Sequence, residues 1–255
     1  MANRIVPRLK LNFNFDLLCP HSYFAYQILQ QKLPQWRQIQ PQFEVEYHPV
    51  LGPKIFKAAH GSLYDGVCKS KRDYIVSELK LIADLYNLPQ PKHLSWDCEL
   101  LDKRSVSAML FLVHLKREAP ELYEPFMQAF WKEIWLNGVN ITKVARILKI
   151  GRLIGIEFRV MDDLCARIEK PINVKTLLNK TNSLVQDNAL STPWFELFNP
   201  ENPEYAYEFT EIGRLETVDD FLKNTDLIPE RRPKQPDQKP RYPSAKSTFV
   251  EDYSC

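Results

Sequence analysis

The residues most able to take part in a reaction are Cys19 and Ser22, the first and last residues of the motif CPHS at positions 19–22. An apolar stretch at residues 9–15 precedes the motif, and a helical pattern begins at Tyr23. The motif is therefore predicted to lie where a buried strand passes into a helix. The free N–H groups and partial positive charge of a helix N-terminus favour a thiolate over a thiol. We predict that the pKa of the Cys19 thiol is lowered.

The same motif limits the chemistry. Ser22 cannot form a disulfide with Cys19, so dithiol exchange by this motif alone is excluded. A protonated His21 would raise the thiolate fraction of Cys19, and its alternative is an ordinary surface histidine. Cys19 itself has the alternative of a small buried hydrophobic residue, which is what most free cysteines are.

The composition is that of a globular chain with no indicated cofactor. Its 255 residues are 44% hydrophobic and 26% charged, and the net charge of +2 indicates neither a nucleic-acid partner nor membrane insertion. No apolar run approaches the roughly 18 residues of a membrane span. The five cysteines form no CxxC pair and no metal-ligand spacing, so we expect no metal and free thiols in a reducing compartment. No clear targeting signal is present.

Two sequence periods alternate along the chain. Period-two stretches predict strands at 9–15, 43–47, 194–198 and 205–209. Helical periods predict a helix from residue 23 that ends before Pro34, and helices at 72–86, 105–116, 122–136, 142–153, 161–167, 174–189 and 217–223, with a long loop at 48–65. This order predicts an α/β chain with a thioredoxin-like fold and a helical insertion.

We therefore expect three parts. Residues 9–65 and 185–225 form the thioredoxin-like domain, residues 66–184 form an inserted all-helical domain, and residues 226–255 form an extended C-terminal tail. The tail is rich in proline and basic residues and has too few apolar residues to fold alone. It is either a solvated arm or a docking segment.

A second chemical element is the segment Ser191-Thr192-Pro193-Trp194, directly before a predicted strand. Thioredoxin-like proteins place a cis-proline opposite the active helix, and the residue before it offers its backbone to a peptide or glutathione. We predict a cis Thr192–Pro193 bond that faces Cys19. The alternative is an ordinary trans proline at the start of an edge strand.

Several blocks, in order, resemble the kappa-class glutathione transferases and the related 2-hydroxychromene-2-carboxylate isomerases, which are DsbA-like insertion variants. The blocks are residues 13–23, 79–82, 105–112, 130–135 and 140–142. The resemblance implies glutathione as co-substrate, no other cofactor, and a small electrophile or a peroxide as second substrate. It also implies a homodimer and mitochondrial or peroxisomal residence, with the cytoplasm as the alternative.

The resemblance assigns site residues as well. The family's catalytic serine corresponds to Cys19, and Thr192 and Pro193 would hold the glutathione backbone. The Asp-Arg pair that receives the γ-glutamyl end corresponds to Gly213 and Arg214, so the arginine is kept and the acid is missing.

A glutathione-contacting asparagine of the family falls near His60 or Gly61, so that contact is altered here. Lys54 and Lys57, in the same predicted loop, would either help to neutralise glutathione or be ordinary solvated lysines. The pocket for the second substrate is expected among apolar residues of the helical insertion.

Three functions remain open. The first is a kappa-like glutathione transferase, with Cys19 and Ser22 as its catalytic residues. The second is a thiol–disulfide oxidoreductase that uses Cys19 as a single reactive thiol. The third is a catalytically weak binding module, which the glycine at position 213 favours.

Overall fold

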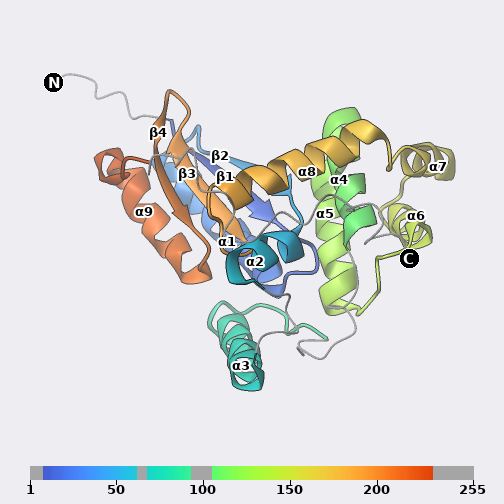
Figure 1. The fold of residues 1–255 in the computed structure, drawn as a ribbon, viewed down its shortest axis with the longest axis horizontal. Helices are drawn as coiled ribbons and strands as arrows, with labels where there is room; N and C mark the ends of the chain where they lie inside the picture. The colour runs from blue at the N-terminus through green and yellow to red at the C-terminus, as the bar shows by residue number, and fades with distance from the viewer. Residues whose placement is uncertain (1–7, 62–67, 93–104, 232–255) are drawn as a thin grey trace.

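Four strands form one mixed sheet in the order β2-β1-β3-β4 (Figure 1). They are β1 (Lys10–Phe15), β2 (Glu44–Pro49), β3 (Trp194–Asn199) and β4 (Asn202–Phe209). Strand β1 is parallel to β2 and antiparallel to β3, which forms a hairpin with β4. Helix α1 (Pro20–Ile39) connects the two parallel strands, since such a pair needs a crossover. The computed structural model describes residues 8–61, 68–92 and 105–231, and it confirms the predicted thioredoxin-like fold.

Most of the other described helices lie between β2 and β3 in the chain, as the predicted insertion requires. They are α2 (Gly52–His60), α3 (Lys69–Leu85), α4 (Val106–Glu118), α5 (Pro120–Trp131), α6 (Val144–Leu153), α7 (Phe158–Ala166) and α8 (Pro171–Gln186), and α9 (Leu215–Lys223) follows β4. Figure 1 shows α4 to α7 gathered to one side of the sheet and α9 on the other. Helix α8 reaches from the helical group back to the strands.

One face of the sheet is aromatic and carries the core. The ring of Phe195 stacks on those of Phe13 and Phe209, with centroids 4.8 Å apart in both pairs. Trp131 of α5 packs against Phe15 at 5.0 Å. Buried residues of the sheet and of the insertion form one continuous cluster. The insertion and the sheet therefore share a core, and truncating one of these aromatic residues to alanine should cost about 3–5 kcal/mol.

The alternate side chains of each strand occupy the opposite face of the sheet, which is largely polar. It also holds Trp194, which packs in a second, smaller apolar cluster with Val50, Ile55, Leu184 and Ala189. Glu196 on β3 is buried there, and it pairs with Lys180 of α8 at 3.2 Å and accepts a hydrogen bond from Asn14 at 3.2 Å. Thr181 of α8 accepts a hydrogen bond from the Leu51 N–H at 3.1 Å. These contacts fix α8 against the sheet, so this helix belongs to both parts of the fold.

The first residues of the predicted tail contact the sheet. The Ala206 N–H on β4 donates to the Pro229 carbonyl at 3.0 Å, and Tyr205 forms a β-bridge with Glu230. The Arg231 guanidinium lies 3.8 Å from Glu196. The segment up to Arg231 therefore docks on β4, and the rest of the predicted tail, residues 232–255, lies outside the described residues.

Two local predictions were wrong. The expected loop at 48–65 contains α2, which has a proline in its first turn and ends at Gly61 with φ of 77°. Both are helix-boundary signals that the sequence already carried. Helix α1 does not end before Pro34 but continues to Ile39. A proline in a helix removes one hydrogen bond, and burial of Leu33 and Trp36 on either side keeps the helix intact.

Candidate active site

Cys19 is the N-cap residue of α1, in the turn that leaves β1. Its N–H donates to the Asp16 carbonyl at 3.1 Å, and Pro20 begins the helix. Its thiol donates to the Thr192 carbonyl at 3.0 Å, and the residue is only 8% exposed. The two predicted chemical elements, far apart in the chain, are therefore in direct contact.

The Thr192–Pro193 bond is cis and this segment faces Cys19, as predicted. Thr192 is buried, and among the described residues its backbone N–H and its hydroxyl have no hydrogen-bond partner. Gly52 approaches so closely that a Cβ at that position would lie 2.7 Å from Thr192 Oγ1. Buried N–H groups without a partner are rare in proteins. Thr192 therefore retains a donor for a bound group, beside the Cys19 thiol.

Burial decides the ionisation of this cysteine. Loss of solvent raises the pKa of the Cys19 thiol, the interactions with Thr192 and with the buried Ser22 lower it, and the charge of Asp16 raises it again. The predicted lowering of the pKa is therefore wrong, because desolvation outweighs the helix N-terminus. His21 does not assist ionisation, since burial lowers its pKa to about 4 and leaves it neutral at pH 7.

Asp16 is a site residue that the sequence analysis missed. Its carboxylate accepts hydrogen bonds from the Leu18 N–H at 3.0 Å, the Gly52 N–H at 2.9 Å and the Ser105 hydroxyl at 3.1 Å. Burial raises the pKa of this carboxyl group, and the three donors lower it. A lone aspartate at the end of an apolar strand was the available signal, because acids are seldom fully buried without partners.

The insertion supports the loop that carries the cysteine. A π-helical turn, η2 (Lys132–Leu136), continues α5 and holds Trp135. The indole N–H of Trp135 donates to the Leu17 carbonyl at 3.2 Å, and its ring stacks on Tyr23 with centroids 6.0 Å apart. The residues on either side of Cys19 are thus fixed by a helix that is more than a hundred residues away in the chain.

The turn with Gly213 and Arg214 lies at the same end of the sheet as Pro193. Thr210, just after β4, donates to the Pro193 carbonyl at 2.7 Å, and the short helix η3 (Ile212–Arg214) follows. Arg214 is exposed and pairs with Glu211 at 3.3 Å. An acid is therefore present in this turn, although not at position 213.

His60 and Gly61 lie at the far end of α2 from the contact with Thr192. Nine residues of helix separate the two ends by about 12 Å. His60 stacks on Phe56 with centroids 4.3 Å apart. The structure does not bring these two predicted residues to Cys19; the first turn of α2, which holds the partly buried Lys54, is the nearer part.

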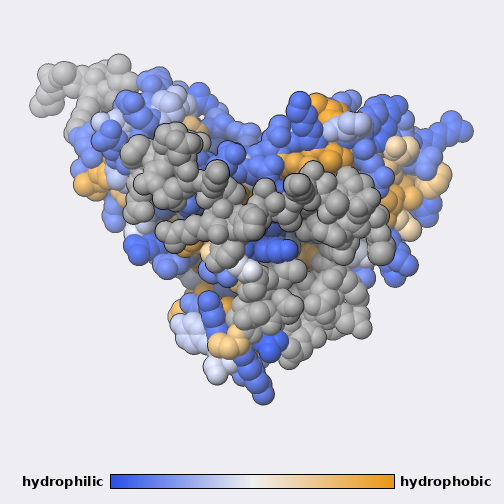
Figure 2. Space-filling model, in the orientation of Figure 1, coloured by the Kyte–Doolittle hydropathy of each residue, from blue (hydrophilic) through white to orange (hydrophobic). Residues whose placement is uncertain are grey.

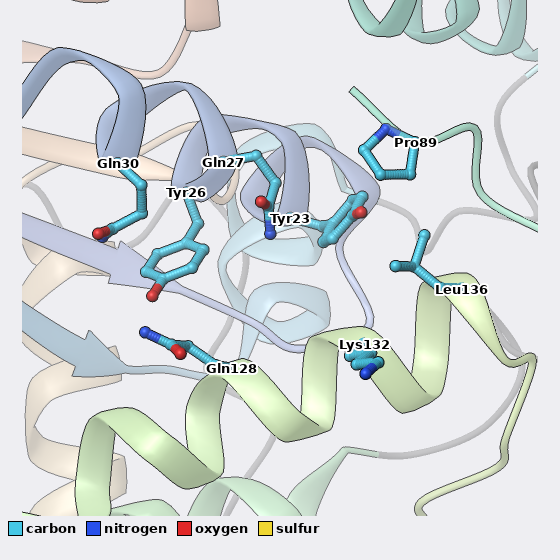
Figure 3. Close-up of a pocket in the computed structure, with 8 residues that line it drawn as sticks. All are labelled: Tyr23, Tyr26, Gln27, Gln30, Pro89, Gln128, Lys132 and Leu136. Carbon is cyan, nitrogen blue, oxygen red and sulfur yellow. The ribbon is translucent and has the colours of Figure 1, made fainter. Parts of the chain in front are cut away.

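A cavity of about 340 Å³ opens between α1 and the insertion (Figure 3). Tyr26 and Gln27 from α1 face Gln128 and Lys132 from α5 and η2 across it, with Tyr23 nearest the N-terminus of α1. Its position next to the insertion agrees with the expected second-substrate pocket. Its lining is mixed, with amides, phenols and Lys132 beside Pro89 and Leu136, whereas a lining of apolar residues of the insertion was expected.

The described residues contain no group of three or more histidine, cysteine or acidic side chains able to hold a metal ion. None of their helices is long and apolar enough to span a membrane.

Comparison with known proteins agrees with this geometry. A family model described as a DsbA-like thioredoxin domain matches residues 10–199. Glutathione S-transferase kappa 1 of Caenorhabditis elegans is 21% identical over 230 residues, which cover 89% of this chain and 96% of that protein. The Homo sapiens protein of the same name is 28% identical over 169 residues, covering 66% of this chain and 71% of its own length.

Solved structures show the same fold. A 2-hydroxychromene-2-carboxylate isomerase aligns with a TM-score of 0.61 at 17% identity, and the alignment covers 86% of this chain and 100% of that one. The cytosolic disulfide reductase DsbM from Pseudomonas aeruginosa aligns with a TM-score of 0.55 at 16% identity, covering 85% of this chain and 93% of that one.

Proposed function

The chain belongs to the DsbA-like thioredoxin domain family, and from that premise we propose that it is a glutathione transferase of the kappa type. The observation that carries the proposal is the Cys19 thiol, which lies 3.0 Å from the Thr192 carbonyl at the N-terminus of α1. Relatives named glutathione S-transferase kappa 1, matched over most of the chain, support the same function.

The backbone at Thr192 would receive glutathione. Its N–H and C=O can pair with the cysteinyl backbone of the tripeptide, as an added strand does. The glutathione sulfur would then lie near Cys19 and the start of α1. The Cys19 S–H, which donates to a carbonyl in the free protein, would turn to the glutathione sulfur and stabilise its thiolate.

The chemical step is a simple displacement. The glutathione thiolate attacks an electrophilic carbon and forms a C–S bond, the leaving group departs with its electron pair, and the thiol proton passes to solvent. With a peroxide, two glutathione molecules are oxidised to their disulfide while the peroxide is reduced to an alcohol and water. Cys19 serves in both reactions as a hydrogen-bond donor.

The turn at Gly213 and Arg214 would hold the γ-glutamyl end. Arg214 can bind its carboxylate, and Glu211, which pairs with Arg214, can take the ammonium group that an acid at position 213 would otherwise bind. Both side chains are exposed and would reorient on binding. The turn therefore provides the two charges that glutathione needs, with the acid two residues earlier than in the family.

Calorimetric titration with glutathione, and conjugation to a chromogenic aryl halide, test the proposal. Cys19→Ser keeps a donor and should retain conjugation, whereas Cys19→Ala should lose about ten- to a hundredfold in rate. Cys165→Ser, a half-buried cysteine on α7, is the matched control. Equal rates for Cys19→Ala and the parent would remove Cys19 from the mechanism. If the parent does not bind glutathione, the binding-module function is the better one.

We also infer a homodimer from the resemblance, with α3 as its contact face. Tyr74, Leu81 and Leu85 are 65%, 57% and 67% exposed, and their spacing places them on one face of the helix. Apolar residues are visible on α3 in Figure 2, below the rest of the molecule. The partner would be a second copy of this chain.

Mitochondrial or peroxisomal residence stays a proposal that cell fractionation would test.

A further inference from the structure

We propose that α6 and the start of α7 form a surface that docks on membranes of anionic phospholipids. The two helices lie at the end of the insertion that is farther from the sheet (Figure 1). This surface, residues 143–160, is separate from the candidate active site, so the proposal goes beyond the proposed function and does not depend on it. It concerns attachment to the face of a bilayer and not a helix that spans it.

The exposed side of α6 is basic. Its cationic residues recur at every third position and are all exposed: Lys143, Arg146, Lys149 and Arg152. Arg146, Lys149 and Leu153 stand at i, i+3 and i+7, which is one face of a helix. Ile147 and Ile150 are buried on the other side. Because α6 packs on the insertion with its apolar side, its basic side faces outward.

The charge of this surface has one sign. Residues 134–156 contain no aspartate or glutamate, and residues 143–160 contain five basic side chains and one acidic side chain, a net charge of +4. The whole chain carries only +2. Within the ranges that the structure describes, Lys143, Arg146 and Lys149 form no ion pair, whereas Arg167 on α7 pairs with Asp163 at 2.5 Å. A positive potential is therefore concentrated on this surface, where it attracts anions.

Large apolar side chains are exposed beside these cations. Leu153, Phe158 and Val160 are 62%, 50% and 44% exposed, and they lie on either side of the turn at Gly155 that joins α6 to α7. The Arg152 guanidinium lies 5.0 Å from the centre of the Phe158 ring, so a cation and an apolar group are in contact. Figure 2 shows apolar residues among hydrophilic ones at this end of the molecule. The surface therefore presents cations and apolar groups together.

An anionic bilayer is the partner that satisfies both kinds of group at once. Lysine and arginine side chains attract its headgroups, and apolar side chains enter the boundary between headgroups and acyl chains. A nucleic acid would pair with the cations but leave Leu153, Phe158 and Val160 in water. Asp162 and Asp163 on α7 would repel either partner, so the attraction comes from α6 and the turn after it.

Sedimentation of the full chain with vesicles tests the proposal. The probes are vesicles of phosphatidylcholine alone and vesicles of equimolar phosphatidylcholine and phosphatidylserine. We expect binding to the second kind only, and added salt should weaken it because salt screens the headgroup charge. One basic residue near an anionic surface strengthens binding about fivefold. Arg146→Gln combined with Lys149→Gln should therefore weaken binding about twenty- to thirtyfold.

Arg37→Gln combined with Lys223→Gln is the matched control. It also removes one exposed arginine and one exposed lysine, so the two double variants have the same net charge. The control residues lie where α1 ends against α9, a contact in which the Trp36 indole N–H donates to Asp219. This variant should bind vesicles as the parent does. Phe158→Ser removes an apolar side chain and no charge, and it should weaken binding about tenfold.

Equal weakening by the two double variants would show that net charge alone causes binding, and it would overturn the proposal. So would equal binding to neutral vesicles, unchanged binding by Phe158→Ser, or tighter binding to a DNA duplex than to the anionic vesicles. Circular dichroism checks the fold of each variant, and if Phe158→Ser does not fold, Val160→Ser is judged by the same criterion. The calorimetric titration with glutathione uses no vesicles, so failure of this proposal and failure of the proposed function are distinguishable.

Discussion

Substituting Gly52 tests the close contact between α2 and the cis-proline segment. An alanine Cβ would lie 2.7 Å from Thr192 Oγ1 and 3.1 Å from Asp16 Cβ. Overpacking of this kind costs about 1–3 kcal/mol, and the better helix propensity of alanine returns at most about 1 kcal/mol. We expect Gly52→Ala to be destabilised by about 1–2 kcal/mol, which is roughly a five- to thirtyfold shift toward the unfolded state.

The cause of that loss can be separated by a double-mutant cycle. Thr192→Ala removes the hydroxyl that the new Cβ meets, and this hydroxyl has no hydrogen-bond partner among the described residues, so its own loss should be small. Thr192→Ser keeps the hydroxyl and is the matched control. We expect Thr192→Ala, but not Thr192→Ser, to recover about 1 kcal/mol of the stability lost in Gly52→Ala.

Urea unfolding of the parent, the three single variants and the two double variants measures the cycle, and calorimetry measures glutathione affinity beside it. Gly52→Ala should also bind glutathione more weakly, because the Thr192 backbone must move to relieve the contact. A Gly52→Ala protein as stable as the parent would refute the reasoning. Equal recovery of stability when Thr192→Ala or Thr192→Ser is combined with Gly52→Ala would show that the Thr192 hydroxyl does not cause the lost stability.

Further predictions concern the turn, the dimer and pH. Arg214→Ala should weaken glutathione binding about tenfold by calorimetry, whereas Gly213→Asp, which meets nothing within 4 Å, should strengthen it. Leu81→Glu should give monomers in sedimentation, and an unchanged dimer would place the interface elsewhere. Burial lowers the pKa of His48 to about 3 from 6.5, so its contribution to stability is complete above about pH 6.5 and is lost as pH falls toward 3. In urea unfolding between pH 7 and 4, the free energy of unfolding of His48→Gln should therefore fall less steeply with decreasing pH than that of the parent. An equal slope in the two proteins would contradict the assignment of this pH dependence to His48.

The sequence was sufficient where the signal was local. Alternation of apolar residues located the strands, and the motif at residues 19–22 fell at the strand–helix junction because its neighbours on both sides are periodic. The position of Pro193 followed from the order of the elements. The strands and the junction depend on residues close together in the sequence, and the order of the elements depends only on their sequence positions, so both can be predicted without the tertiary structure.

The network around Asp16 could not be predicted in this way. Two of its three donors, Gly52 and Ser105, are 36 and 89 residues away, and the carbonyl that accepts from Cys19 is 173 residues away. None of these partners has a sequence pattern that marks it as a partner. Burial of Cys19 is likewise a property of the packed insertion and sheet, so its effect on the thiol appears only in the folded chain.

The ionisation of Cys19 illustrates why a motif predicts position better than chemistry. A helix N-terminus typically stabilises a negative charge by about 0.3–1 kcal/mol, and by about 2 kcal/mol in favourable cases. Desolvation of a buried group can shift a pKa by several units, at about 1.4 kcal/mol for each unit. At a buried junction, desolvation therefore outweighs the helix, and the acid at position 16 acts in the same direction. In the mechanism that we propose, Cys19 would take the role of a serine hydroxyl, and for that reason serine, rather than alanine, is the conservative substitution at this position.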